Sequence, residues 1–147
     1  MKTIEMYEFV VNETGDMEST GFGPCIGVAF VAAGGGALMH SNDPRMVAGE
    51  EFLEAIESAV PIADRALISP VVFGGAPDED VTISQETNAS RQWICDKLVS
   101  LGFKTPKLHS CPTENSSQDV VVTPSDKRVT IYPLIDGRSV DPIVIEF

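Results

Sequence analysis

A cysteine and a histidine in the first third of the chain have the types and surroundings of a nucleophile and its base. Cys25 lies in the segment GFGPCIGVAF, where it follows Pro24 and begins an apolar run. His40 ends the next apolar run. A neighbouring imidazole can accept the proton of a thiol, and the sulfur can then attack a carbonyl carbon. Because Cys25 is the first residue of its run, beside glycines, we expect its thiol to stand clear of the core.

The runs that contain this pair predict a hairpin that brings the two side chains together. Residues 26–31 and 37–40 are strand-like, and the glycines at 34–36 separate them. A short glycine-rich connection of this kind is typical of an antiparallel hairpin. Cys25 begins the first arm and His40 ends the second. The two are therefore expected to face each other, or nearly so, at the roughly 4.5–5.5 Å that separates opposed residues.

Two hydroxyl side chains just upstream are candidates for orienting the histidine ring. A catalytic histidine commonly donates its second ring N–H to a third group, which fixes the ring. Ser19 and Thr20 precede the turn that carries Cys25. Successive strand residues point to opposite faces, so only one of the two is expected to reach His40, and the register favours Ser19.

Cys25 and His40 could also be ordinary packing residues, and packing is the preferred interpretation of Cys95. A cysteine in an apolar strand is commonly a small buried hydrophobe. Cys95 lies beside Ile94 on the inner side of a predicted helix and is interpreted as a core residue. His109 and Cys111 could supply two metal ligands, but the sequence has no second ligand pair at the spacing of a zinc finger. No metal site is therefore predicted.

Composition is that of a globular protein with one core. The chain has 147 residues, 43% hydrophobic and 22% charged, so we expect a single domain over residues 1–147. A formal charge of −12 disfavours nucleic acid and anionic membranes as partners, because like charges repel. The first residues lack a signal-peptide pattern, and no apolar run is long enough for membrane insertion. With three cysteines and no spaced framework, free thiols and a cytoplasmic location are expected.

The remaining pattern indicates an α+β fold. A first helix is expected to begin at SNDP, residues 41–44, and to end at Pro61, and a second to cover 86–101 before Gly102. Strands joined by tight turns, together with two main helices, predict a layered α/β sandwich of mainly antiparallel strands. Besides the two hairpin arms, strands are predicted over residues 5–11, 66–73, 120–122, 128–132 and 143–146.

In their order and spacing, several segments resemble the CheD family of chemoreceptor glutamine deamidases, and more distantly the deamidating toxins of the cytotoxic-necrotizing-factor type. The family's nucleophilic cysteine corresponds to Cys25 and its catalytic histidine to His40. Where the family carries a threonine before the cysteine, this chain has Ser19, with Thr20 one position nearer. The matching segments are STGFGPCIGV at 19–28, GALMH at 36–40, VVFGGA at 71–76 and ISQETN at 83–88.

This resemblance implies a single deamidase domain over residues 1–147, in which Cys25 converts a substrate glutamine into glutamate through a thioester. His40 would act as the base, and Ser19 or Thr20 would orient it. The implied partner is a protein with an accessible glutamine, on a chemoreceptor or another target. The implied chemistry uses no metal and no organic cofactor.

Two features depart from the family's pattern. Pro24 has no N–H, so an oxyanion would be stabilised by the Cys25 N–H and another donor, such as that of Gly23. The polar segment SCPTENSSQDVVV at 110–122 replaces a glycine-rich ending and is expected to form a loop. Two alternatives remain: a thiol hydrolase or acyl transferase that uses the same pair, and a non-catalytic protein-binding module in which Cys25 is buried.

Overall fold

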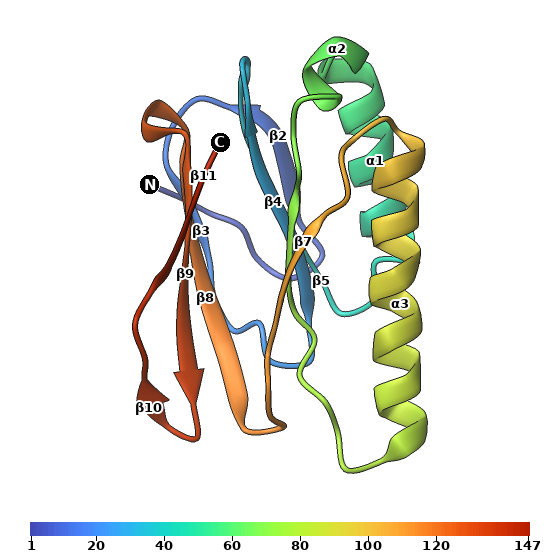
Figure 1. Ribbon diagram of the computed structural model, residues 1–147, viewed down its shortest axis with the longest axis vertical. Helices are drawn as coiled ribbons and strands as arrows, with labels where there is room; N and C mark the ends of the chain where they lie inside the picture. The colour runs from blue at the N-terminus through green and yellow to red at the C-terminus, as the bar shows by residue number, and fades with distance from the viewer.

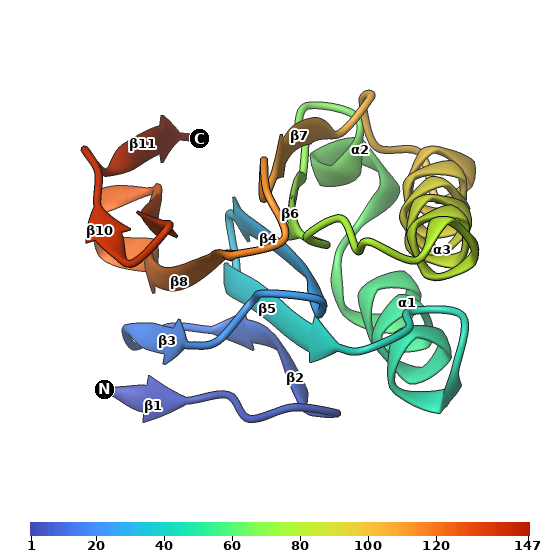
Figure 2. The ribbon, with the colours of Figure 1, turned by 90° about the horizontal axis from the view of Figure 1, so that it is seen from below.

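The computed structural model describes all 147 residues, which form three layers. An outer sheet, an inner sheet and a layer of helices lie in that order (Figure 1; Figure 2). The outer sheet contains β1 (Lys2–Thr3), β3 (Met17–Ser19), β8 (Ser116–Thr123), β9 (Arg128–Ile135), β10 (Arg138–Ser139) and β11 (Ile143–Glu146). The inner sheet contains β2 (Phe9–Glu13), β5 (Gly35–Ser41), β4 (Ile26–Ala32), β6 (Val71–Gly74) and β7 (Lys107–Ser110), in that spatial order. The helices are α1 (Val47–Ala59), the short α2 (Ile62–Arg65) and α3 (Val81–Ser100), and a 3₁₀ turn, Pro124–Asp126, joins β8 to β9.

This arrangement confirms the predicted fold class, a layered α+β sandwich of mostly antiparallel strands with two main helices. Only two strand pairs are parallel, β1 with β3 and β6 with β7. The parallel β6–β7 pair is joined through α3, because parallel neighbours need a long crossover connection. The helices are all too short or too polar to traverse a lipid bilayer.

The inner sheet is buried on both faces and the outer sheet on one, and the strands of the two sheets differ in sequence accordingly. Helices cover one face of the inner sheet and the outer sheet covers the other, so almost every residue of β4 and β5 is buried. Such strands have continuous apolar sequences rather than alternating ones. In β8 of the outer sheet, buried and more exposed residues alternate, because its far face meets solvent.

Two apolar clusters lie on opposite faces of the inner sheet and together form the core. Ala29 and Val31 of β4 pack toward the outer sheet, with Leu38 of β5. Val28 of β4 and Met39 of β5 belong to the cluster beneath the helices. This alternation determines which layer each side chain of the hairpin faces.

The predicted hairpin and the C-terminal ends of both helices are confirmed, but the second helix begins at Val81 rather than at residue 86, and two predicted strands are too long. The chain first turns at Glu5 and Glu8, where the Glu8 N–H donates to the Glu5 carbonyl at 3.0 Å, so β2 begins only at Phe9. Residues 66–70 are not a strand: 66–68 continue from α2 in hydrogen-bonded turns, and β6 begins only at Val71. The predicted loop at 110–122 is also mostly wrong, since β8 begins at Ser116.

The first helix begins later than predicted because Asp43 has another role. Its carboxylate accepts hydrogen bonds from Arg45 Nη2 at 2.8 Å and from the buried Ser90 hydroxyl of α3 at 2.7 Å. Arg45 also pairs with Glu86 of α3 at 2.8 Å. Asp43 therefore joins the start of α1 to α3, and α1 begins at Val47.

We expect the substitution Asp43→Asn to lower the free energy of unfolding fully above about pH 4 and progressively less as the pH falls toward 2. The hydrogen bonds and charge of Arg45 lower the pKa of Asp43 to about 2. A carboxyl whose folded pKa is depressed stabilises the fold above its ordinary pKa and loses that contribution as the pH falls toward the folded value. Denaturant unfolding of wild type and Asp43→Asn should differ by about 1–2 kcal/mol at pH 7 and converge near pH 2. Asp126→Asn, at an exposed position without an ion pair, is the control, and a constant Asp43→Asn difference from pH 7 to 2 would contradict the assignment.

Candidate active site

The strand register places Cys25 and His40 as diagonal neighbours rather than opposed ones. His40 pairs with Gly27, and Ile26 pairs with Ser41, across a two-residue loop at positions 33–34. Cys25 is therefore two positions from the residue that faces His40. Diagonal pairs have Cα atoms about 7–8 Å apart, against about 4.5–5.5 Å for opposed ones. The two residues lie at the open end of the hairpin as predicted, but they are diagonal neighbours, so their separation is larger than the predicted separation of about 4.5–5.5 Å for opposed residues.

Both side chains lie on the same face of the inner sheet, toward the outer sheet. Cys25 belongs to the apolar cluster between the two sheets. The His40 ring stacks on Phe22 of the same cluster, with ring centroids 4.0 Å apart. A thiol and an imidazole are thus held in the space between the sheets at the open end of the hairpin.

Ser19 of the outer sheet contacts the His40 ring and determines which nitrogen carries the proton. Ser19 Oγ lies 2.8 Å from His40 Nδ1 and donates its single hydrogen to the Ile4 carbonyl at 2.5 Å. A carbonyl can only accept, so the hydroxyl must accept from Nδ1–H. His40 Nε2 is then unprotonated in the neutral ring and can accept a proton. Thr20, the other predicted candidate, is exposed and makes no contact of this kind.

The glycine opposite His40 provides the space for this packing. A Cβ on Gly27 would lie 2.3 Å from the Phe73 ring and 2.6 Å from the Phe22 ring. The two aromatic rings pack edge to face, with centroids 4.7 Å apart. Phe22, which lies between two glycines of the turn, is therefore the apolar support of the imidazole.

A second polar link between the sheets fixes the backbone beside Cys25. The buried Gln118 side chain accepts from the Gly74 N–H at 2.7 Å and donates to the His109 carbonyl at 2.8 Å. A Cβ on Gly74 would lie 2.1 Å from the Cys25 carbonyl oxygen. Only glycine permits this approach, at a backbone φ of +79°.

The Cys25 thiol does not stand clear of the core, which contradicts the sequence prediction. Its side chain belongs to the buried cluster and is 7% exposed. The sulfur contacts Met6 Sδ at 3.7 Å and makes no hydrogen bond to His40. Met6 lies in the turn that Glu5 and Glu8 close, and the next residue, Tyr7, has a φ of 71°. The N-terminal segment therefore covers the sulfur, which local sequence patterns could not indicate.

Burial keeps both groups neutral. It raises the pKa of the Cys25 thiol and lowers the pKa of the His40 imidazole. Desolvation disfavours the charged form of each, so the resting pair is a thiol and a neutral imidazole rather than a thiolate and an imidazolium. Proton transfer must then accompany attack by the sulfur.

One of the two predicted oxyanion donors is already engaged. The Gly23 N–H donates to the Gly21 carbonyl at 3.0 Å, and the Gly23 carbonyl accepts from Ala76. The Cys25 N–H makes no hydrogen bond within the protein. Because Pro24 has no N–H, Cys25 carries the free backbone donor next to the sulfur.

The other thiols and the second histidine do not form a site with this pair. Cys95 is half-buried and packs against the cluster beneath the helices. Cys111 is buried and donates from Sγ to the Phe22 carbonyl at 3.0 Å. His109 lies on β7, at the edge of the inner sheet. No group of three or more His, Cys, Asp or Glu side chains is arranged to hold a metal ion.

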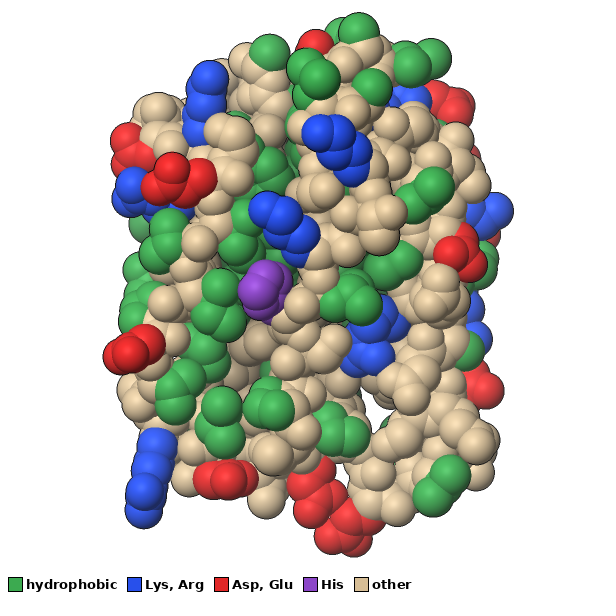
Figure 3. Space-filling model, in the orientation of Figure 1, with side chains coloured by type: hydrophobic (Ala, Val, Ile, Leu, Met, Phe, Trp, Pro, Cys, Tyr) green, Lys and Arg blue, Asp and Glu red, His purple; other side chains and the backbone are tan.

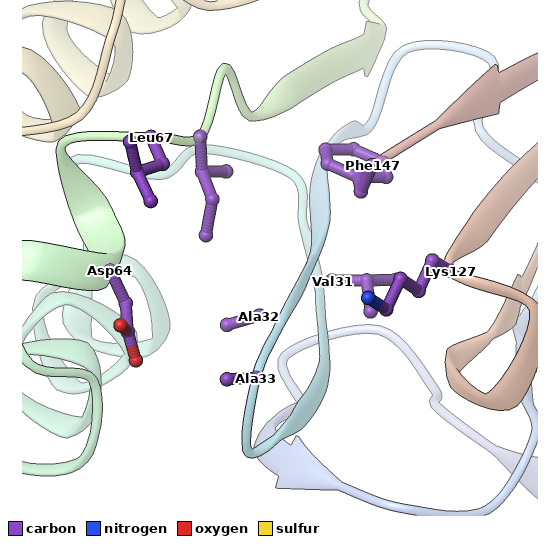
Figure 4. Close-up of a pocket in the computed structure, with 8 residues that line it drawn as sticks. Val31, Ala32, Ala33, Asp64, Leu67, Lys127 and Phe147 are labelled. Atoms are coloured by element: carbon purple, nitrogen blue, oxygen red, sulfur yellow. The ribbon is translucent and has the colours of Figure 1, made fainter.

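Two surface cavities are lined by residues that neighbour Cys25 or His40 in the sequence, although neither is lined by Cys25 or His40 itself. One of about 510 Å³ is lined in part by Tyr7, Ser41 and Asn42. The other, of about 410 Å³, is lined in part by Pro24 and Ala76. A more apolar pocket of about 240 Å³ lies at the closed end of the hairpin, where Figure 4 shows side chains from β4, the α2 region and the C-terminal residue around it. That pocket is remote from the thiol.

Neither a protein-family model nor a curated protein matches the sequence.

We expect Met6 to limit the reaction of Cys25 with alkylating reagents. In the wild type, iodoacetamide should modify Cys25 more slowly than the half-buried Cys95, and the Cys25 rate should rise with pH beyond pH 9. The substitution Met6→Ala should accelerate the Cys25 reaction roughly tenfold, since it removes the covering side chain. Peptide mass spectrometry with Met46→Ala as the control methionine measures both effects. A Cys25 rate that is already maximal at pH 5 would show a thiolate ion pair and contradict the neutral pair.

Proposed function

We propose that this protein is a cysteine-dependent glutamine deamidase that acts on protein substrates. The observation that carries the proposal is the hydrogen bond from His40 Nδ1 to Ser19, which leaves Nε2 unprotonated on the face that Cys25 shares. A nucleophile, a base and an orienting hydroxyl from two sheets are the components that acyl-transfer chemistry needs. The resemblance to glutamine deamidases supports amide hydrolysis among the reactions open to such a site.

In the first half-reaction, the thiol attacks the carboxamide carbon of the substrate glutamine. Cys25 Sγ forms the new C–S bond while its proton moves to His40 Nε2, and the amide oxygen becomes an oxyanion near the free Cys25 N–H. Ammonia then leaves, with the proton that His40 returns to it. The product is a thioester between the substrate and Cys25.

In the second half-reaction, water hydrolyses that thioester. His40 Nε2 takes a proton from the water, the oxygen adds to the carbonyl carbon, and the C–S bond breaks with return of the proton to sulfur. The net change is glutamine plus water to glutamate plus ammonia. The steps use no oxidant and require no cofactor.

Access to the sulfur requires a local rearrangement of the covering segment. The thiol contacts Met6 rather than His40, so Met6 must move and the cysteine side chain must rotate toward the ring. Pro24, next to Cys25, lines a surface cavity of about 410 Å³ from which a substrate side chain could approach. We propose that docking of a protein substrate displaces the turn at residues 5–8.

One specific observation favours a non-catalytic alternative. The Cys25 side chain is 7% exposed, as expected of a packing residue in a protein-binding module. A packing role alone does not, however, account for an imidazole whose Nδ1 is fixed by a buried serine while its Nε2 lacks a hydrogen-bond partner. A thiol hydrolase or acyl transferase shares the first half-reaction and differs only in what attacks the thioester.

We expect the Cys25→Ser variant to release no ammonia from glutamine-containing proteins. Wild type should convert glutamine to glutamate in casein and in helical glutamine peptides, detected by peptide mass spectrometry together with ammonia release. His40→Ala should lower the rate about 100-fold or more, because general base catalysis contributes roughly that much. Cys95→Ser is the matched control and should keep wild-type activity. Equal conversion by wild type and Cys25→Ser would rule out the mechanism, and cross-linked products would indicate the acyl transferase.

A further inference from the structure

Arg91 of α3 is an arginine without an acidic partner in a strongly acidic protein. Its Nη1 donates to Asn88 Oδ1 at 2.8 Å and its Nη2 to the Gly75 carbonyl at 2.7 Å, both neutral groups. Its buried Nε has no hydrogen-bond partner. The chain has 22 acidic residues against 10 basic ones, yet no carboxylate pairs with this guanidinium.

Arg65, which is a buried arginine, uses its whole guanidinium for structural hydrogen bonds, whereas Arg91 is half-buried. Arg65 donates from Nε, Nη1 and Nη2 to three backbone carbonyls, so each of its nitrogens is used. Arg91 differs because one nitrogen is left over. Burial also lowers the pKa of Arg91, which reflects an uncompensated charge held away from water. An anion beside it would relieve that cost.

The cavity at Arg91 offers donors and no carboxylate. It has a volume of about 210 Å³ and is lined in part by Asn88, Ser110 and Cys111. The Asn88 oxygen already accepts from Arg91, which leaves its amide hydrogens free, and the Ser110 hydroxyl makes no hydrogen bond within the protein. Figure 3 shows a hollow on this face beside α3, with a basic side chain at its rim.

We propose that this cavity binds a single small oxyanion group, a carboxylate or a phosphate, through Arg91 and Ser110. Each Nη of Arg91 has one hydrogen left over, and these hydrogens can donate to the oxygens of such a group. The neighbouring cavity is lined by Asp78, Glu79 and Glu114, which repel a larger polyanion. These acids favour a carboxylate, with its single charge, over a phosphate.

The oxyanion site adjoins the segment that carries Cys25. Gly75 accepts from Arg91 through its carbonyl and donates from its N–H to the Cys25 carbonyl at 2.8 Å. Gly75 therefore connects Arg91 to Cys25. An acidic group of a docked protein that binds Arg91 would lie next to the backbone of the candidate nucleophile. The existence of the oxyanion site does not depend on the deamidase activity, because binding alone defines it.

The test is an NMR titration of the full chain with sodium acetate and with sodium phosphate, each against sodium chloride at matched ionic strength. We expect saturable shifts of the Arg91 Nε–H and of the Gly75 and Ser110 amides. Arg91→Gln should raise the Kd at least about tenfold, since it removes a charged hydrogen-bond pair. Lys97→Gln, at an exposed position of the same helix, should leave the Kd unchanged.

Every outcome of this titration decides the proposal. Tighter binding of acetate assigns a carboxylate ligand, and tighter binding of phosphate assigns a phosphorylated one. Linear shifts equal to those in chloride, or an unchanged Kd in Arg91→Gln, would overturn the site. If Arg91→Gln does not fold, Ser110→Ala should weaken binding several-fold, and wild-type affinity in that variant would overturn the site equally.

Discussion

The buried hydrogen bond between Ser19 and His40 is the contact on which the candidate site depends. It joins the outer sheet to the inner one, and the Ile4 carbonyl determines its direction by taking the only serine proton. Three segments that are distant in sequence thereby fix one ring tautomer. Without this constraint, His40 would be a neutral imidazole among apolar side chains, free to carry its proton on either nitrogen.

Burial around this contact has two consequences for chemistry. Desolvation keeps Cys25 and His40 neutral. It also makes a hydrogen bond or an electrostatic attraction between them stronger than it would be in water. Under the proposed function, the site excludes substrate until Met6 moves, and the N-terminal turn that covers Cys25 controls access to the sulfur.

Local sequence rules predicted the hairpin and the choice of Ser19 over Thr20, because both follow from the two-residue period of a strand. They failed where distant segments meet. Met6 covers Cys25 only because β1 runs beside β3, and Gln118 reaches Gly74 only across the layers. The unpaired nitrogen of Arg91 could not be predicted either, since it depends on which acidic side chains the fold keeps away from this guanidinium. Asp43 was misread because its partner Ser90 lies on another helix.

The most direct measurement of the central claim is the ¹⁵N NMR spectrum of the His40 ring, assigned with the variant His109→Gln. At a pH above its pKa, the ring should carry its proton on Nδ1 and a bare lone pair on Nε2. Ser19→Ala should shift the proton toward Nε2, whereas Thr20→Ala should leave the spectrum unchanged. A wild-type ring protonated on Nε2, or one indifferent to Ser19→Ala, would contradict the account.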